Sequence, residues 1–177
     1  MGKLVFQIRN LTIPDVKDVY QLLAVNRPYV GLNSRYTYFL LAKDFSGTCL
    51  VAECDSRIVG FASGYVPPMR PDTFFSWEIV VDKNCRGHGL SKKLLLNQIC
   101  QGDERYLEAT VNPSNEAAKK SYRGLAHLLK AECLETLLFS EGDFEFDGHE
   151  PEVLFRIGPF SKSLVEKLAL GNSKKLF

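Results

Sequence analysis

Residues 74–91 pass from an apolar, β-branched segment into a basic turn with two glycines and then into a helical pattern. The branched side chains at 79–81 suit a buried strand. Gly87 and Gly89 come next, just before the first leucine of the helix. The start of a helix exposes unpaired backbone N–H groups and the positive end of its dipole, and glycines let an anion come close. The segment predicts a strand, a loop for a phosphate or pyrophosphate, and a helix.

Two common nucleotide loops do not fit this segment. The full Gly-x-Gly-x-x-Gly pattern is absent because position 92 is Lys92, and no Gly-Lys-Ser/Thr follows. A turn that uses its glycines only to reach positive φ is an alternative, because such turns are common. The remaining functional interpretation is a loop that binds an acyl-CoA.

This loop resembles the acetyl-CoA loop of the GNAT acetyltransferase superfamily, which reads Gln/Arg-x-x-Gly-x-Gly/Ala after the fourth strand. Gly87 and Gly89 match it, whereas Asn84 departs from the Gln/Arg position. The resemblance implies a GNAT fold, which is a mixed, mainly antiparallel central sheet with helices on both faces, and it implies acetyl-CoA as co-substrate. The cofactor-binding residues expected on this basis are Ile79, Val80, Val81, Asn84, Arg86, Gly87, His88, Gly89, Leu90, Ser91 and Asn115.

Further motifs narrow the resemblance. Asn115, Ala118 and Tyr122 match the Asn-x-x-Ala-x-x-x-Tyr helix that follows the fifth GNAT strand. The segments LNSRYTYFLL, TCLVAE, IVGFASGY, RPDT, RYLEATVNPSNEA and GHEPEVLFRIGP together resemble the L-2,4-diaminobutyrate acetyltransferases of ectoine biosynthesis over nearly all of residues 6–159. The resemblance implies acetyl transfer to the 4-amino group of diaminobutyrate, and it suggests a homodimer.

Length, charge and cysteine content set the broad class. A chain of 177 residues has the size of one domain, with a GNAT domain expected at 1–160 and a helical or flexible tail at 161–177. With a net charge of only +1, the protein has no broad electrostatic field that would attract nucleic acid or an acidic membrane surface. The amino terminus lacks a signal-peptide pattern, and the five cysteines are odd in number and scattered. A cytoplasmic protein without a metal site is expected.

Hydrophobic periodicity and turn residues predict alternating strands and helices. Helices are expected at about 12–23, 33–45, 90–100 and 114–129, and one short helix lies in the tail after residue 161. Strands are expected at 5–9, 48–53, 58–65, through Trp77 to 81, and at 106–111, 133–139 and 152–157.

The acceptor chemistry requires a group that takes a proton, because an alkylamine with a pKa near ~10.4 is almost fully protonated at neutral pH. By the resemblance, Glu152 is the first candidate to hold the ammonium and relay its proton, and His149 is the second. The alternative is a solvated loop before a strand. Cys85 has no recognisable His base beside it, so direct transfer in a ternary complex is expected rather than an acetyl-cysteine.

One backbone group and three further side chains are candidates for the site. A backbone N–H near residues 79–81 is expected to bind the oxyanion. Trp77 is predicted to shield the acceptor from water or, alternatively, to be a core aromatic. Glu78 stands where the resembling family more often has Gln, which adds a negative charge near the site. Tyr122 occupies the position of a GNAT tyrosine that can protonate the departing thiolate, although the diaminobutyrate branch often has Phe there.

Gly31 is the most consequential departure, since the LNS motif in the family commonly follows Asp. Either another carboxylate holds the substrate cation, or acceptor specificity has changed. Asn33, Tyr36 and Tyr38 match or approximate the family and are expected to shape that wall. Two alternatives therefore stay open: a GNAT enzyme for another primary amine, such as a polyamine or another diamino acid, and a non-catalytic acyl-CoA-binding protein.

Overall fold

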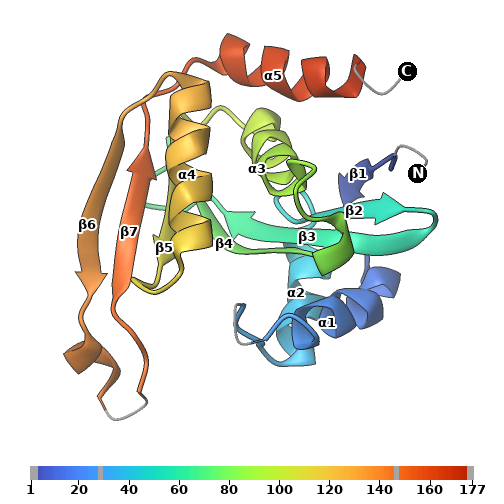
Figure 1. Cartoon of the computed structure of the whole chain (residues 1–177), viewed down its shortest axis with the longest axis horizontal. Coiled ribbons are helices and arrows are strands. Elements are labelled where there is room, and N and C mark those ends of the chain that lie inside the picture. The colour runs from blue at the N-terminus through green and yellow to red at the C-terminus, as the bar shows by residue number, and fades with distance from the viewer. Residues whose placement is uncertain (1–3, 28–29, 146–147, 175–177) are drawn as a thin grey trace.

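A computed structural model describes residues 4–27, 30–145 and 148–174. Its centre is a seven-stranded sheet with the order β1-β2-β3-β4-β5-β7-β6 (Figure 1). The strands are β1 (Gln7–Asn10), β2 (Leu50–Cys54), β3 (Arg57–Tyr65), β4 (Thr73–Val81), β5 (Tyr106–Val111), β6 (Cys133–Phe139) and β7 (Glu152–Ile157). The helices are α1 (Val16–Ala24), α2 (Arg35–Asp44), α3 (Leu90–Gln101), α4 (Glu116–Leu129) and α5 (Lys162–Lys174).

The predicted fold class is confirmed, because every strand pair is antiparallel except β4 with β5, and helices cover both faces. The predicted strands and helices are present, with boundary shifts of a few residues. The helix expected from residue 33 begins at Arg35, since the hydroxyl of Ser34 accepts the backbone N–H of Thr37 and caps it. The strand expected from Thr48 begins at Leu50, because the Thr48 N–H closes a turn onto Phe45.

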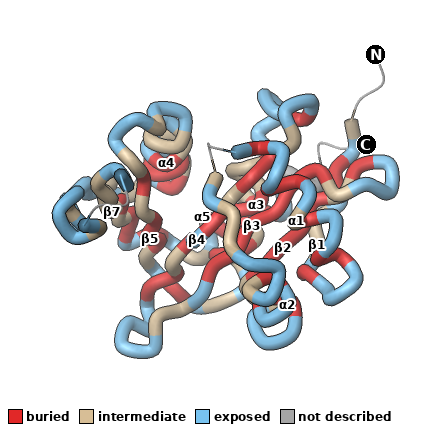
Figure 2. The backbone as a smooth tube through the Cα atoms, turned by 90° about the horizontal axis from the view of Figure 1, so that it is seen from below, coloured by how far each residue is buried: buried red, intermediate tan, exposed pale blue. Residues whose placement is uncertain are grey.

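The helices bury apolar side chains against opposite faces of the sheet. On one face α1 and α2 enclose a core that includes Tyr38, Phe61 and Val80. On the other face α3 and α4 cover two further clusters, one of which contains Leu95, Leu125 and other buried residues. Figure 2 shows the buried positions following the central strands, while the connecting loops are exposed.

The sheet opens between β4 and β5, and this opening positions the site. Their ladder consists of three pairs, the last joining Phe75 to Glu108. Beyond Phe75 the strand stays paired with β3, where a register shift opposes Ser63 to Glu78 and Gly64 to Ser76. Trp77 is therefore the extra residue of a β-bulge, a feature that bends a strand and re-aims its side chains. A cleft forms where the two parallel strands separate.

The chain after residue 161 forms α5, which lies across α3 (Figure 1). The ammonium group of Lys162 donates to the carbonyl oxygens of Ile99 at 2.9 Å and Cys100 at 3.0 Å, and also to that of Gly102. A cation satisfies the free carbonyls at the end of a helix and interacts favourably with its dipole. No helix among the described residues is long and apolar enough to span a membrane.

Candidate active site

Two adjoining cavities occupy the cleft. The polar cavity, of about 350 Å³, is lined by charged and amide side chains that include Asn33, Glu78, Asn112, His149 and Glu152. The loop cavity, of about 460 Å³, extends towards the glycine loop and is lined in part by Val81, Arg86, Ser91, Leu95 and Ser121. Both share Val30, Ile79, Asn115, Ala118 and Tyr122, so the two cavities are continuous.

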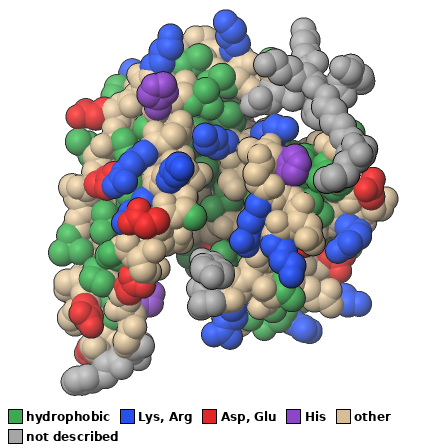
Figure 3. All heavy atoms as spheres, viewed as in Figure 1, with side chains coloured by type: hydrophobic (Ala, Val, Ile, Leu, Met, Phe, Trp, Pro, Cys, Tyr) green, Lys and Arg blue, Asp and Glu red, His purple; other side chains and the backbone are tan. Residues whose placement is uncertain are grey.

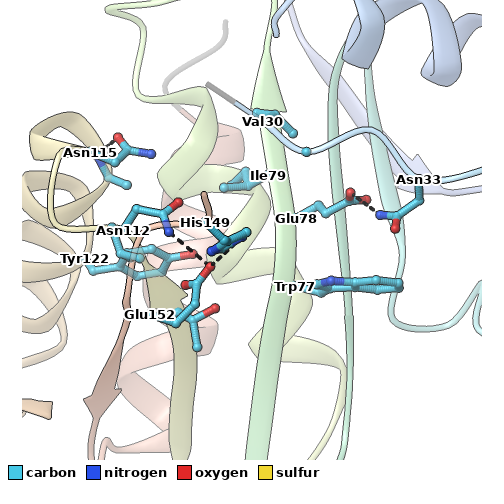
Figure 4. A pocket seen from close by; sticks show the side chains of 14 residues that line it. Val30, Asn33, Trp77, Glu78, Ile79, Asn112, Asn115, Tyr122, His149 and Glu152 are labelled. Carbon is cyan, nitrogen blue, oxygen red and sulfur yellow. Dashed lines mark hydrogen bonds and ion pairs between the residues drawn. The ribbon is translucent and has the colours of Figure 1, made fainter. Parts of the chain in front are cut away.

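Glu152 and His149 face each other in the polar cavity (Figure 4). Glu152 is the first residue of β7, and its Oε1 accepts a hydrogen bond from Asn112 Nδ2 at 3.2 Å. His149 Nε2 lies 3.7 Å from the same oxygen. His149 Nδ1 lies 2.6 Å from the carbonyl oxygen of Glu150, which can only accept, so Nδ1 donates this bond. Neutral His149 therefore presents a lone pair on Nε2 beside a carboxylate, an arrangement that can receive a proton.

Glu78 lies across β4 from that pair (Figure 4). Its Oε1 accepts hydrogen bonds from Asn33 Nδ2 at 2.8 Å and from the hydroxyl of Tyr38 at 3.3 Å. The residue is only 8% exposed. Burial raises the pKa of Glu78 to about 7, against the opposing effect of these hydrogen bonds. A second carboxyl that can be ionised near neutral pH thus borders the cavity.

Trp77 on β4 and Tyr122 on α4 both line the polar cavity. Trp77 is 43% exposed and lines the polar cavity, so the alternative of a core aromatic does not apply. Tyr122 is buried where the two cavities meet, and its hydroxyl lies 3.5 Å from Ser76 Oγ. Burial raises the pKa of Tyr122, so its hydroxyl is neutral at physiological pH. It can donate a hydrogen bond to an atom at this junction.

The glycine loop has the geometry of an anion site. Gly87 and Gly89 adopt φ values of +80° and +70°, which L side chains rarely adopt. α3 starts directly after Gly89, which provides no side-chain cap for the first backbone N–H groups. The loop is held by Arg86, whose guanidinium donates to Asn26 Oδ1 at 2.6 Å and to the Val81 carbonyl at 3.2 Å. Free N–H groups at the start of α3 can therefore bind a phosphate.

Residues 16–126 match the Acetyltransferase (GNAT) family. The L-2,4-diaminobutyric acid acetyltransferase of Marinococcus halophilus is 39% identical over 155 residues, covering 85% of this chain and 88% of that protein. The enzyme of the same description from Chromohalobacter salexigens is 41% identical over 157 residues, covering 86% and 81%. The chain belongs to this acetyltransferase family.

A solved structure agrees with this assignment. Diaminobutyrate acetyltransferase from Paenibacillus lautus, in complex with L-2,4-diaminobutyric acid and coenzyme A, matches with a TM-score of 0.84 and 33% identity. The match covers 90% of this chain and 98% of that one. The resemblance predicted from the LNS, GHE and EVLFRIGP segments is confirmed.

Not every residue expected to serve the family's site lies in the cleft. Tyr36 is 69% exposed on α2 and is not among the residues that line the polar cavity, and Tyr38 lies beneath Glu78, fully buried. Asn84 and His88 are exposed on the loop. The side chains of Val80 and Leu90 are buried in the core, so only their backbone is available to a ligand. Asn115, by contrast, lines both cavities, and its side chain caps α4 by accepting the N–H of Ala118.

The structure adds residues that the sequence motifs did not single out. Asn112 orients Glu152, and Ser76 contacts Tyr122. Asn112 precedes a proline at the end of β5, a pattern typical of a turn, and this pattern could have drawn attention to it. Cys85 is buried, and burial raises the pKa of its thiol, which makes it a poor nucleophile. Within the described residues no cluster of His, Cys, Asp and Glu is arranged to hold a metal ion.

Basic side chains surround the outer part of the cleft. Figure 3 shows Lys and Arg gathered over α4 and beside the hollow next to it. Two cations on α4 already have partners. Lys119 donates a hydrogen bond to the carbonyl oxygen of Pro113 and forms a salt bridge with Glu116. Arg123 forms a bidentate salt bridge with the carboxylate of Glu135. Such exposed pairs stabilise a protein little, and each of them is neutral overall.

Proposed function

We propose that this protein transfers the acetyl group of acetyl-CoA to the 4-amino group of L-2,4-diaminobutyrate, a step of ectoine biosynthesis, by direct transfer in a ternary complex. The observation that carries the proposal is the continuity of the polar cavity with the loop cavity at Tyr122. Glu152 and His149, which line the polar cavity 3.7 Å apart, support the proposal as a proton-accepting pair. The relatives named above are described as L-2,4-diaminobutyric acid acetyltransferases, and the solved structure is described as a complex with L-2,4-diaminobutyric acid and coenzyme A.

The acceptor arrives as an ammonium ion and must lose a proton before it attacks. The carboxylate of Glu152 attracts the ammonium and, with His149 Nε2, offers two acceptors for its proton. Asn112 keeps Glu152 oriented because it donates to Oε1 and also to the carbonyl oxygen of Pro151 at 3.3 Å. The free amine then attacks the thioester carbonyl.

The oxyanion that forms needs donors that are already in place. The β4 ladder to β5 ends at Phe75, so the backbone around Ile79 borders the cleft instead of a neighbouring strand. In this proposal the departing CoA sulfur occupies the cavity junction, which Tyr122 lines. Since burial raises the pKa of this phenol, it stabilises the thiolate through a hydrogen bond rather than by full proton transfer.

The test is release of free CoA from acetyl-CoA with L-2,4-diaminobutyrate, ornithine, lysine, putrescine and spermidine, with the acetyl group located by NMR. Preference for diaminobutyrate and acetylation at its 4-amino group support the proposal. One observation favours a rival function, a GNAT enzyme that acetylates a larger amine. A Cβ added at Gly31 would meet nothing within 4 Å, so this wall of the cavity leaves room for a longer substrate. Preference for a longer diamine supports that rival, and CoA binding without turnover of any amine supports a non-catalytic acyl-CoA-binding protein.

We also propose that the enzyme is a homodimer that works in the cytoplasm. β6 pairs with β7 on one side and forms the outer edge of the sheet (Figure 1). Its large apolar side chains Leu134, Leu137, Leu138 and Phe139 are exposed. A second copy presents the same edge, and two-fold pairing buries both. Light scattering should show a dimer mass that Leu137→Glu lowers towards the monomer. The free state of all five cysteines suits a reducing compartment.

A further inference from the structure

Asn33, Tyr38 and Glu78 form a closed ring of hydrogen bonds beside the polar cavity. The backbone N–H of Asn33 donates to the Tyr38 hydroxyl at 3.1 Å, and that hydroxyl donates to Glu78 Oε1 at 3.3 Å. The side-chain amide of Asn33 closes the ring by donating to the same Oε1 at 2.8 Å (Figure 4). Asn33 is thus held through both its backbone and its side chain.

The other two members of the ring have rigid supports. Tyr38 is fully buried on α2, and its ring packs edge-on against Tyr20 and Phe61, with centroids 6.1 and 6.0 Å apart. Glu78 belongs to the central strand β4, where it lies opposite Ser63 of β3. Because these supports belong to the hydrophobic core and the sheet, the ring fastens Asn33 to parts of the fold that move little.

The segment that the ring fastens forms one wall of the polar cavity. Val30, Gly31 and Asn33 all line it, and Figure 4 shows Asn33 on the other side of β4 from Glu152 and His149. Gly31 has open space around it and makes no side-chain contact of its own. Val30 and Leu32 pack against the core under α1 and α2, and the contact of Asn33 with Glu78 is the polar anchor of this wall.

Burying an ionised carboxylate at position 78 costs free energy. The residue is buried, and among the described residues its Oε2 makes no hydrogen bond of ordinary geometry, although Ser63 lies opposite it. An amide would accept the same two hydrogen bonds without the cost of burying a charge. Hydrogen bonds to a charged acceptor are stronger than those to a neutral one, so the charge tightens the hold on Asn33.

We infer that Glu78 is a positioning residue for acceptor binding: through the ring with Asn33 and Tyr38 it holds the cavity wall formed by Val30, Gly31 and Asn33. It sets the affinity for the diamino acid without touching the reacting atoms. The inference rests on the proposed function and extends it, since it assigns a role in acceptor recognition to a pair of residues 45 positions apart.

The experiment exchanges the donor and the acceptor of the Asn33–Glu78 contact. Asn33→Asp alone places two carboxyl groups against each other and should raise the KM for diaminobutyrate by about tenfold or more. Glu78→Gln alone keeps an acceptor oxygen but loses its charge, so it should raise this KM by only about threefold. In the double variant the introduced amide can donate to the introduced carboxylate, so the KM should return to within about threefold of the parent value. The KM for acetyl-CoA should stay constant throughout.

Two control variants separate this role from general effects. Glu104→Gln neutralises a carboxyl that is equally buried at 8% exposure and also has an unpartnered oxygen, but it precedes β5 away from the cavity. Asn10→Asp adds the same charge as Asn33→Asp at the exposed end of β1. Both should leave the diaminobutyrate KM unchanged. The inference is overturned if the double variant binds diaminobutyrate no better than Asn33→Asp, or if Asn33→Asp equals the parent.

Failure of the proposed function gives a different result. A parent enzyme that turns over no amine contradicts that function, and the ring is then tested by thermal unfolding of the same four proteins. Coupling between the two substitutions, with the double variant melting higher than Asn33→Asp, supports the ring. Strictly additive shifts in melting temperature overturn it.

Discussion

The Nε2 atom of His149 lies 3.7 Å from Oε1 of Glu152, while the opposite nitrogen of the imidazole is committed to a backbone carbonyl. This arrangement fixes which nitrogen carries the proton in neutral His149 and turns an accepting atom towards the cavity. Asn112 holds the carboxylate from the other side. The loop before β7 and the turn after β5 therefore build one proton-accepting unit from residues far apart in sequence.

Replacing Glu152 by Gln should lower kcat for diaminobutyrate by about 10²-fold or more, since general-base groups typically contribute 10²–10⁴-fold. The affinity for acetyl-CoA should stay nearly constant, because Glu152 lines the polar cavity and is not among the residues that line the loop cavity. Steady-state kinetics and calorimetry measure the two quantities. Glu150→Gln is the matched control, as this exposed carboxylate bonds to Ser114. Equal turnover in parent and Glu152→Gln would remove Glu152 from the mechanism.

Replacing Tyr122 by Phe should reduce kcat by about 10- to 150-fold, the size expected when a hydrogen bond of about 1.5–3 kcal/mol to a charged thiolate is lost. The reason is that the pKa of the buried phenol is raised, so it is a weaker acid than a CoA thiol, whose pKa is about 8.5. Single-turnover rates with diaminobutyrate measure the effect. A loss of 10³-fold would instead establish Tyr122 as the essential acid.

Glu78 should make the folded protein less stable as pH rises from 5 to 8. Its pKa is raised from 4.5 to about 7 in the folded state, so between these values the folded protein binds a proton that the unfolded chain releases. Stability from this group is complete below pH 4.5 and is lost as pH rises through 7, by on the order of 3 kcal/mol in total. Tyr38 and Cys49, with pKa values raised to about 12 and about 11, stay neutral over this range.

The measurement is urea unfolding of the parent and of Glu78→Gln at several pH values between 5 and 8. The difference in unfolding free energy between them should shift in favour of the variant as pH rises, because the amide does not titrate. Glu104→Gln serves again as the control for removal of a buried carboxyl. A difference that does not change with pH would contradict the raised pKa.

Gly89→Ala should raise the KM for acetyl-CoA and lower stability by about 1–2 kcal/mol, because φ of +70° is strained for a residue with Cβ. The strain moves the backbone N–H groups that begin α3, which are the expected phosphate donors. Gly47→Ala is the control, since Gly47 is exposed and a Cβ there meets nothing within 4 Å. An unchanged acetyl-CoA KM in Gly89→Ala would place the phosphates elsewhere.

The amino-acid sequence alone determined the elements and their order. The strand, glycine loop and helix at 74–101, and the alternation of the other strands and helices, could be predicted because hydrophobic period and turn residues are local properties. Gly87 and Gly89 marked the loop for the same reason, since positive φ is a local requirement. The family motifs added the residues of the GHE segment.

Tertiary structure decided which of these residues meet. The contacts of Asn33 and Tyr38 with Glu78, and the contact of Asn112 with Glu152, join residues 40 or more positions apart, and no local pattern encodes their distance. Trp77 is exposed to the cleft because a register shift between β3 and β4 re-aims it, whereas the sequence left a site position and a core position equally open. Burial sets the raised pKa of Glu78, and burial exists only after α2 and the sheet have packed together.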